Sequence, residues 1–179
     1  MFKLFYPYEY VESVFEIDYE KLYGIGYRGI IFDIDNTLVH HGEDSTPEVD
    51  ELFREIHKIG LKTLLLSNND TERIERFLIN INSLYIPDAD KPKVGNFYKA
   101  LEMLEIKKNE AVVVGDQLFT DVYGANKAGI ASILVRFLQH KNEIKIGKKR
   151  RVEKLILMFY KHNKLCRNRI GDIHKERYE

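Results

Sequence analysis

The chain has 179 residues, 44% of them hydrophobic, with 28 basic and 28 acidic side chains and no formal net charge at pH 7. This length suits one domain, and the composition argues against extensive disorder. The sequence has no apolar run of the roughly 20 residues that span a bilayer, and residues 1–10 lack the apolar core of a signal peptide. The single cysteine, Cys166, excludes an intrachain disulfide and favours a reducing, cytoplasmic setting.

The N-terminal segment, residues 1–24, is rich in Phe and Tyr, and we expect it to pack on the body of the domain rather than form a surface for lipid or a partner. Ile30–Ile34 is predicted as a short strand, apolar on both faces as parallel strands usually are. Asp33 and Asp35 interrupt this apolar run. Because an unpaired carboxylate inside a strand would be costly, we place both where the strand ends.

This pair of acids permits more than one interpretation. In an extended chain, residues two apart share a face, so both carboxylates could converge on one cation. If the chain turns at Ile34, the two carboxylates could instead flank one reacting group. A pair of solvated acids that shape a turn is the alternative without chemistry.

The remaining elements alternate in type along the chain. They are a helix from Thr46-Pro47 to Gly60, a strand over Leu61–Leu66 that stops at Ser67-Asn68, a helix from Thr71 through Ile81, a helix carrying Phe97–Leu104, a strand over Ala111–Val114 that stops at Gly115-Asp116, a helix over Asp121–Ala128 and a strand over Ala131–Val135. This alternation predicts an α/β fold with a doubly wound, mostly parallel sheet and helices on both faces. Ligands of such sheets bind beyond the carboxyl ends of the strands, so the polar groups that follow the strands should meet at one edge.

Four segments resemble, in order, the four motifs of the haloacid dehalogenase (HAD) superfamily. They are Asp33-Ile34-Asp35-Asn36-Thr37, Ser67 after Leu64-Leu65-Leu66, Lys91-Pro92 and Gly115-Asp116-Gln117-Leu118-Phe119-Thr120-Asp121. The resemblance implies a HAD-like core over about residues 25–138. The first and last segments more narrowly resemble the YqeG-like, subfamily IIIA phosphatases, a group similar to phosphatidylglycerophosphate phosphatases. The 29 residues between Thr37 and Ser67 and the 23 between Ser67 and Lys91 leave no room for an inserted cap domain.

The resemblance also implies a hydrolase that removes phosphate from a monoester through an aspartyl-phosphate, with Mg²⁺ as cofactor. The implied catalytic residues are Asp33 as nucleophile, Asp35 as general acid and then base, and Lys91 as the cation beside the phosphoaspartate. The implied substrate contacts are Thr37, Ser67 and Asn68, and the implied metal ligands are Asp33, the backbone carbonyl of Asp35 and Asp116, supported by Asp121. An acid at position 35 favours ester hydrolysis over dehalogenation, because an alkoxide needs a proton to leave and a halide does not.

Other polar residues near these motifs have plainer interpretations. Lys93 is a weaker rival of Lys91, and His40 and His41 are expected to be exposed loop residues. The alternative to an enzyme is a non-enzymatic phosphoaspartate switch or binding protein on a receiver-like sheet, since receiver domains also combine acids, Mg²⁺ and a lysine. Their phosphorylated aspartate, however, lies on a different strand from their paired acids.

The C-terminal tail, residues 139–179, carries 13 basic and 5 acidic residues, whereas the rest of the chain carries 15 and 23. Within it, Lys148-Lys149-Arg150-Arg151 precedes apolar residues at helical spacing, which are Val152, Leu155, Ile156, Phe159 and Tyr160. We expect this stripe to dock on the sheet. Peripheral contact with an anionic membrane is the alternative and would suit a phospholipid headgroup as substrate. No motif supports nucleic-acid binding.

Overall fold

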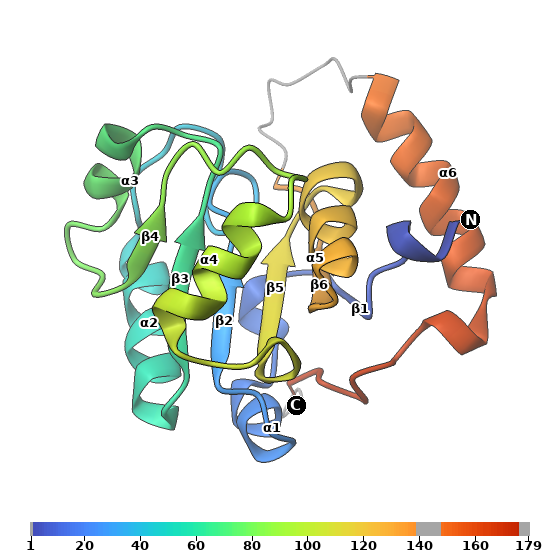
Figure 1. Ribbon diagram of the computed structural model, residues 1–179, viewed down its shortest axis with the longest axis horizontal. Coiled ribbons are helices and arrows are strands. Elements are labelled where there is room, and N and C mark those ends of the chain that lie inside the picture. Colours follow the sequence, from blue (N-terminus) through green and yellow to red (C-terminus); the bar gives the residue numbers. More distant parts are fainter. Residues whose placement is uncertain (1, 139–147, 176–179) are drawn as a thin grey trace.

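The computed structural model describes residues 2–138 and 148–175, so residues 139–147 and 176–179 of the predicted tail lie outside the described part. Six strands form one sheet in the order β1-β6-β5-β2-β3-β4, and every neighbouring pair is parallel (Figure 1). The strands are β1 (Glu9–Val11), β2 (Gly29–Phe32), β3 (Lys62–Leu66), β4 (Leu84–Ile86), β5 (Ala111–Gly115) and β6 (Ala131–Val135). The doubly wound parallel sheet predicted from the alternation of elements is therefore confirmed.

Helices cover both faces of the sheet. They are α1 (Tyr19–Gly24), α2 (Pro47–Ile59), α3 (Thr71–Phe77), α4 (Gly95–Leu104), α5 (Tyr123–Ala128) and α6 (Lys148–His162). Helix α2 shows how local sequence sets these bounds. The Thr46 hydroxyl accepts a hydrogen bond from the amide of Val49, Pro47 occupies the first turn, and Gly60 ends the helix at φ 101°, a conformation that glycine adopts without strain.

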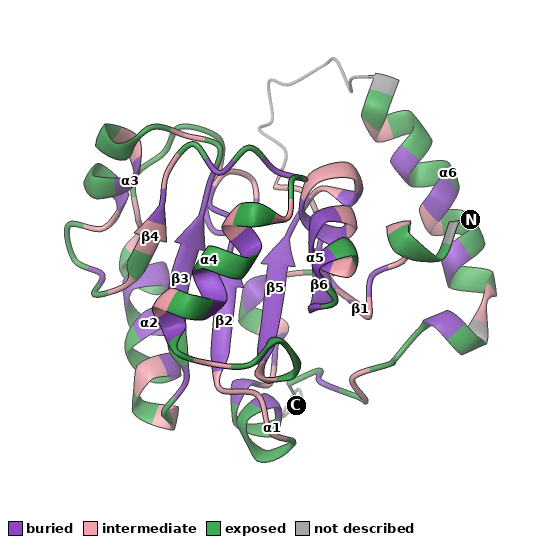
Figure 2. Cartoon of the chain, in the orientation of Figure 1, coloured by how far each residue is buried: buried purple, intermediate pink, exposed green. Residues whose placement is uncertain are grey.

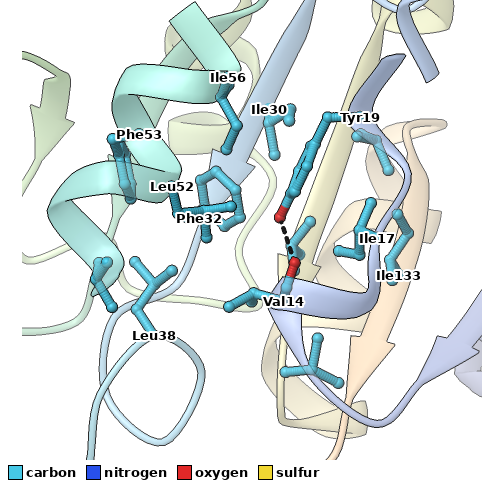
Figure 3. Packing of buried hydrophobic residues seen from close by; sticks show 14 of the residues in the cluster. Val14, Ile17, Tyr19, Ile30, Phe32, Leu38, Leu52, Phe53, Ile56 and Ile133 are labelled. Atoms are coloured by element: carbon cyan, nitrogen blue, oxygen red, sulfur yellow. Dashed lines mark hydrogen bonds between the residues drawn. The ribbon is translucent and has the colours of Figure 1, made fainter. Parts of the chain in front are cut away.

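Alternating side chains of β2 build the two halves of the core. Ile30 and Phe32 face α1 and α2, and Figure 3 shows Phe32 lying beside Leu52 and Phe53 of α2, with 5.4 Å between the two phenyl centroids. Ile31 points to the other face and joins the cluster beneath α4 and α5. The central strands are buried throughout (Figure 2). They therefore form a rigid base for whatever follows their carboxyl ends.

The structure differs from the predicted elements in several places. Helix α3 ends at Phe77, before the predicted end at Ile81, and the amide of Leu78 bonds back to the carbonyl of Ile74. Strands β1 and β4 were not predicted, because three residues are too few to show a periodic pattern. Strand β2 ends at Phe32, and the amides of Thr37 and Leu38 turn back to the carbonyl of Ile34. A π-helical turn, η4 (Leu118–Val122), precedes α5, so the helical stretch begins before the predicted start.

The N-terminal segment and α6 both lie at the β1–β6 side of the sheet (Figure 1). Strand β1 extends the sheet beside β6, and the ring of Phe5 stacks on Tyr123 of α5 at 4.7 Å between centroids. The expected docking of the apolar stripe of α6 holds only in part. Ile156 and Tyr160 are buried, and Ile156 clusters with Leu118 and Val122 of η4, whereas Val152, Leu155 and Phe159 are exposed. None of the helices in the described chain is long and apolar enough to cross a bilayer. The docking of α6 brings its first turn to the carboxyl end of β5.

Candidate active site

Three buried carboxylates meet where β2 and β5 end. Asp33 follows β2, Asp116 follows β5, and Asp121 lies in η4, while β2 and β5 are neighbours with Phe32 paired to Val114. One oxygen from each carboxylate lies within 4.8 Å of the others, and all three residues are buried. We call Asp33, Asp116 and Asp121 the acid cluster.

Lys91 crosses from the loop after β4 into the acid cluster. Its ammonium lies 2.6 Å from Oδ1 of Asp33 and 2.7 Å from Oδ1 of Asp121, and the residue is buried. The backbone amide of Lys91 donates to Oδ1 of Asn68 at 2.9 Å, which anchors the loop to the end of β3. Burial alone would lower the pKa of Lys91, but Asp121 and Asp33 together raise it, so this side chain is a fixed positive charge.

The hydroxyl of Thr37 orients two members of the acid cluster. It donates to Oδ2 of Asp33 at 3.1 Å and lies 3.5 Å from Oδ1 of Asp116. Ser67 is buried at the end of β3, the strand next to β2, and its hydroxyl accepts a hydrogen bond from the amide of Asn69 at 3.2 Å. The third sequence motif thus reaches the acid cluster through Lys91, while Ser67 of the second lies at the end of the neighbouring strand β3.

Burial makes two carboxylates of the acid cluster hard to ionise. Burial raises the pKa of Asp33 to about 6, although the charge of Lys91 opposes the rise. Burial also raises the pKa of Asp116 to about 8, the charge of Asp33 adds to this, and Arg150 opposes it. Converging buried carboxylates that resist ionisation suit a divalent cation with a preference for oxygen ligands, and Mg²⁺ is such an ion.

The side chain of Asp35 lies outside the acid cluster and has its own partners. Its two oxygens accept hydrogen bonds from Asn69 at 2.8 Å, Arg73 at 3.0 Å and the amide of Gly42 at 3.1 Å, and His41 lies 3.1 Å away. Partial burial would raise the pKa of Asp35, but these hydrogen bonds and the charge of Arg73 lower it. The environment therefore favours the ionised form.

The structure brings Asp33, Thr37, Lys91, Asp116 and Asp121 together and turns the Asp35 side chain toward α3. The rival lysine, Lys93, is exposed and pairs with Asp90. His41 is mostly exposed, as expected, but touches Asp35, which the sequence did not indicate. The expectation of exposure was wrong for His40, which is half-buried with its Nδ1 lying 3.2 Å from the carbonyl oxygen of Leu138.

Two arginines at the site were not found from the sequence. Arg73 lies in the first turn of α3, where a positive charge interacts unfavourably with the helix dipole. This unfavourable position was the only local feature of the sequence that could have marked Arg73 as a functional residue. Arg150 of α6 binds Asp116, but it is one of four consecutive basic residues, and nothing local distinguishes it from Arg151.

Gly115 leaves room for Asp121, and this predicts a specific sensitivity. A Cβ at position 115 would lie 2.4 Å from Cγ of Asp121, so Gly115→Ala must displace that carboxylate from Lys91 and from the amide of Gln117. We expect a loss of about 1–3 kcal/mol in the free energy of unfolding, measured in urea. The matched control is Gly95→Ala, because a Cβ there meets nothing within 4 Å. Equal stability of the two variants would contradict the close approach.

Comparison with known proteins agrees with this geometry. Residues 41–129 match the family described as haloacid dehalogenase-like hydrolase. The chain is 41% identical over 134 residues to the probable phosphatase YqeG of Bacillus subtilis (strain 168). The aligned residues cover 74% of this chain and 78% of that protein.

Two solved structures share the fold. An uncharacterized protein from Listeria monocytogenes serotype 4b has a TM-score of 0.53 and 22% identity, over 76% of this chain and 99% of that one. NagD from E. coli K-12 has a TM-score of 0.53 and 15% identity, over 68% of this chain and 93% of that one. At these identities the two structures bear on the fold alone, whereas the match to the Bacillus protein extends over most of both chains.

Proposed function

Because the chain belongs to the haloacid dehalogenase superfamily and to its YqeG-like phosphatases, we propose that it hydrolyses a phosphate monoester in two steps through a phosphorylated Asp33, with Mg²⁺ held at the acid cluster. The observation that carries this proposal is the buried contact of Lys91 with Asp33 and Asp121 beside Asp116. A carboxylate attacks phosphorus effectively only where fixed positive charge offsets the charge of the transferring oxygens, and Lys91 provides part of that charge.

In the first step, a carboxylate oxygen of Asp33 attacks the phosphorus and the bond between phosphorus and the alcohol oxygen breaks. The leaving oxygen takes a proton from Asp35. In the second step, water attacks the phosphorus, its proton goes to Asp35, and the bond between phosphorus and Asp33 breaks, which releases phosphate and restores the carboxylate. Thr37 and Lys91 hold Asp33 in one orientation throughout. By the resemblance of their motif, Ser67 and Asn68 would contact the phosphoryl group from the end of β3.

The acid cluster fits a divalent cation because it presents converging, buried oxygen ligands whose ionisation is otherwise opposed. Asp33, Asp116 and the backbone carbonyl of Asp35 would hold Mg²⁺, with Asp121 in support. When bound, the ion supplies the positive charge that stabilises the phosphoryl oxygens during transfer.

The surroundings of Asp35 affect its proposed roles as acid and as base differently. The hydrogen bonds from Asn69 and Arg73 favour the carboxylate, which suits the base that accepts a proton from water in the second step. To donate a proton in the first step, Asp35 must be protonated, so the substrate has to displace at least one of these partners. The lowered pKa keeps Asp35 ionised and able to accept a proton, at the cost of making it a weaker base, and it makes the acid role depend on bound substrate.

We further propose that the substrate is a phospholipid headgroup, with phosphatidylglycerophosphate as the first candidate through the resemblance of the YqeG-like group to phosphatidylglycerophosphate phosphatases. The outer face of α6 supports this choice. Its apolar residues Val152, Leu155 and Phe159 are exposed, and so are the basic residues Arg151 and Lys154. Exposed apolar and basic side chains together suit peripheral contact with an anionic membrane.

The test is a panel of phosphate monoesters assayed in Mg²⁺ and again after EDTA treatment. The panel includes an aryl phosphate, small sugar phosphates and phosphatidylglycerophosphate in anionic vesicles. We expect phosphate release in Mg²⁺, fastest for the lipid, and a fall to background in EDTA that added Mg²⁺ reverses. An unchanged rate in EDTA would contradict the metal assignment. Faster hydrolysis of a sugar phosphate than of the lipid would contradict the proposal that the substrate is a phospholipid headgroup.

The alternative, a phosphoaspartate switch, predicts a different outcome in the same assay. A switch would form one equivalent of phosphoaspartate that persists for hours without turnover. Multiple turnovers of any panel member support the hydrolase instead.

A further inference from the structure

The first turn of α6 delivers a guanidinium to the carboxylate that the proposed function assigns to Mg²⁺. Arg150 binds Oδ2 of Asp116 through Nη2 and the backbone carbonyl of Asp116 through Nη1, the latter at 2.7 Å. We propose that Arg150 is a positioning residue for the metal site, which clamps Asp116 so that its other oxygen, Oδ1, faces Asp33. This inference rests on the proposed function, because it concerns the metal site of that reaction.

The two oxygens of Asp116 have different surroundings. Oδ1 lies 3.5 Å from the hydroxyl of Thr37, and that hydroxyl donates to Oδ2 of Asp33 at 3.1 Å. Oδ2 faces the other way and is bound by Arg150. A guanidinium that holds both the carboxylate and the main-chain carbonyl of one residue restricts rotation of that side chain, because its donors form a rigid planar fork.

Two further side chains hold Arg150 in place. Its Nη1 also donates to Oε2 of Glu153 at 3.0 Å, and the guanidinium carbon lies 4.4 Å from the ring centroid of Phe137. The other carboxylate oxygen of Glu153 accepts a hydrogen bond from the amide of Leu118 at 3.0 Å. Glu153 thus connects α6 to the start of η4, and Arg150 cannot move away from Asp116 without losing several contacts at once.

The charges favour a positioning role over competition with the metal. Glu153 is buried, with 6% of its surface exposed, and its charge is opposite to that of Arg150. Glu153 therefore offsets part of the positive charge that Arg150 brings to Asp116, and the bond from Nη2 engages only Oδ2 of that carboxylate. Groups that orient metal ligands in this way affect metal affinity by roughly 10- to 100-fold when they are removed.

The experiment compares Arg150→Gln with Arg151→Gln in the full chain. Arg151 is the next residue of the same helix, is exposed, and loses the same charge on substitution. Each metal-free protein is titrated with Mg²⁺ by calorimetry at neutral pH, and its fold is checked by circular dichroism. We expect the dissociation constant to rise roughly 10- to 100-fold for Arg150→Gln and to stay unchanged for Arg151→Gln.

Arg150→Lys keeps the charge but loses the planar fork, so it separates orientation from charge. We expect it to weaken Mg²⁺ binding as well, and its fold should tolerate the substitution if Arg150→Gln does not. The second readout is the Mg²⁺ concentration at half-maximal activity, which should rise while turnover recovers at high Mg²⁺. Unchanged or tighter Mg²⁺ binding in both Arg150 variants would overturn the inference and leave the proposed function standing. A wild-type chain that binds no Mg²⁺ would overturn the inference together with the metal part of the proposed function.

Discussion

Asp33→Asn is expected to abolish phosphate release from every monoester that the wild-type protein hydrolyses in Mg²⁺, a loss of roughly 10³-fold or more, as is typical when a covalent nucleophile is removed. The amide is nearly the size of the carboxylate, but it is a poor nucleophile and a poor ligand for Mg²⁺. It also loses the ion pair with the Lys91 ammonium, which lies 2.6 Å from Oδ1 in the wild type. The measurement is steady-state release of phosphate at saturating Mg²⁺.

The matched control for this substitution is Asp88→Asn. Asp88 is exposed and adopts a positive φ of 45°, which asparagine tolerates as well as aspartate does. We expect its rate to equal that of the wild type. Mass spectrometry after rapid acid quench should find a phosphorylated peptide containing Asp33 in the wild type and none in Asp33→Asn. Wild-type turnover by Asp33→Asn would exclude Asp33 as the nucleophile.

Lys91→Met is expected to cost both stability and activity. Lys91 is buried and lies between Asp33 and Asp121, so its removal leaves two buried carboxylates facing each other without a cation. Breaking a buried ion pair by removing one partner typically costs about 3–5 kcal/mol, which equilibrium unfolding in urea would measure. Phosphate release should fall with it, because the charge that offsets the phosphoryl oxygens is gone.

Lys93→Met is the control for Lys91→Met, because it makes the same lysine-to-methionine substitution two residues further along the loop. Lys93 is exposed and pairs only with the exposed Asp90 among the residues the structure describes, and surface pairs of this kind contribute little. We expect no measurable change in stability or activity. Similar losses in both variants would show that the charge of this loop matters and that the buried position of Lys91 does not.

The positions of the polar residues at strand ends could be read from sequence because the signal is local. An apolar run that stops at Asp33, at Ser67 or at Asp116 marks the end of a buried strand, and parallel topology places those ends at one edge. The edge strands gave no such signal. Strand β1 has three residues and includes Glu9, which is buried and accepts a hydrogen bond from the amide of Ile170, a residue far along the chain.

The sequence by itself determined the parallel α/β sheet and the residue types at the carboxyl ends of its strands, because periodicity and chain breaks are properties of neighbouring residues. Only the tertiary structure decided that Lys91 lies between Asp33 and Asp121, that Asp35 turns toward Arg73, and that Arg150 reaches Asp116. These contacts join residues 30 to 58 positions apart. Their geometry is set by helix docking and burial, whose energies depend on surfaces that meet only after the chain has folded.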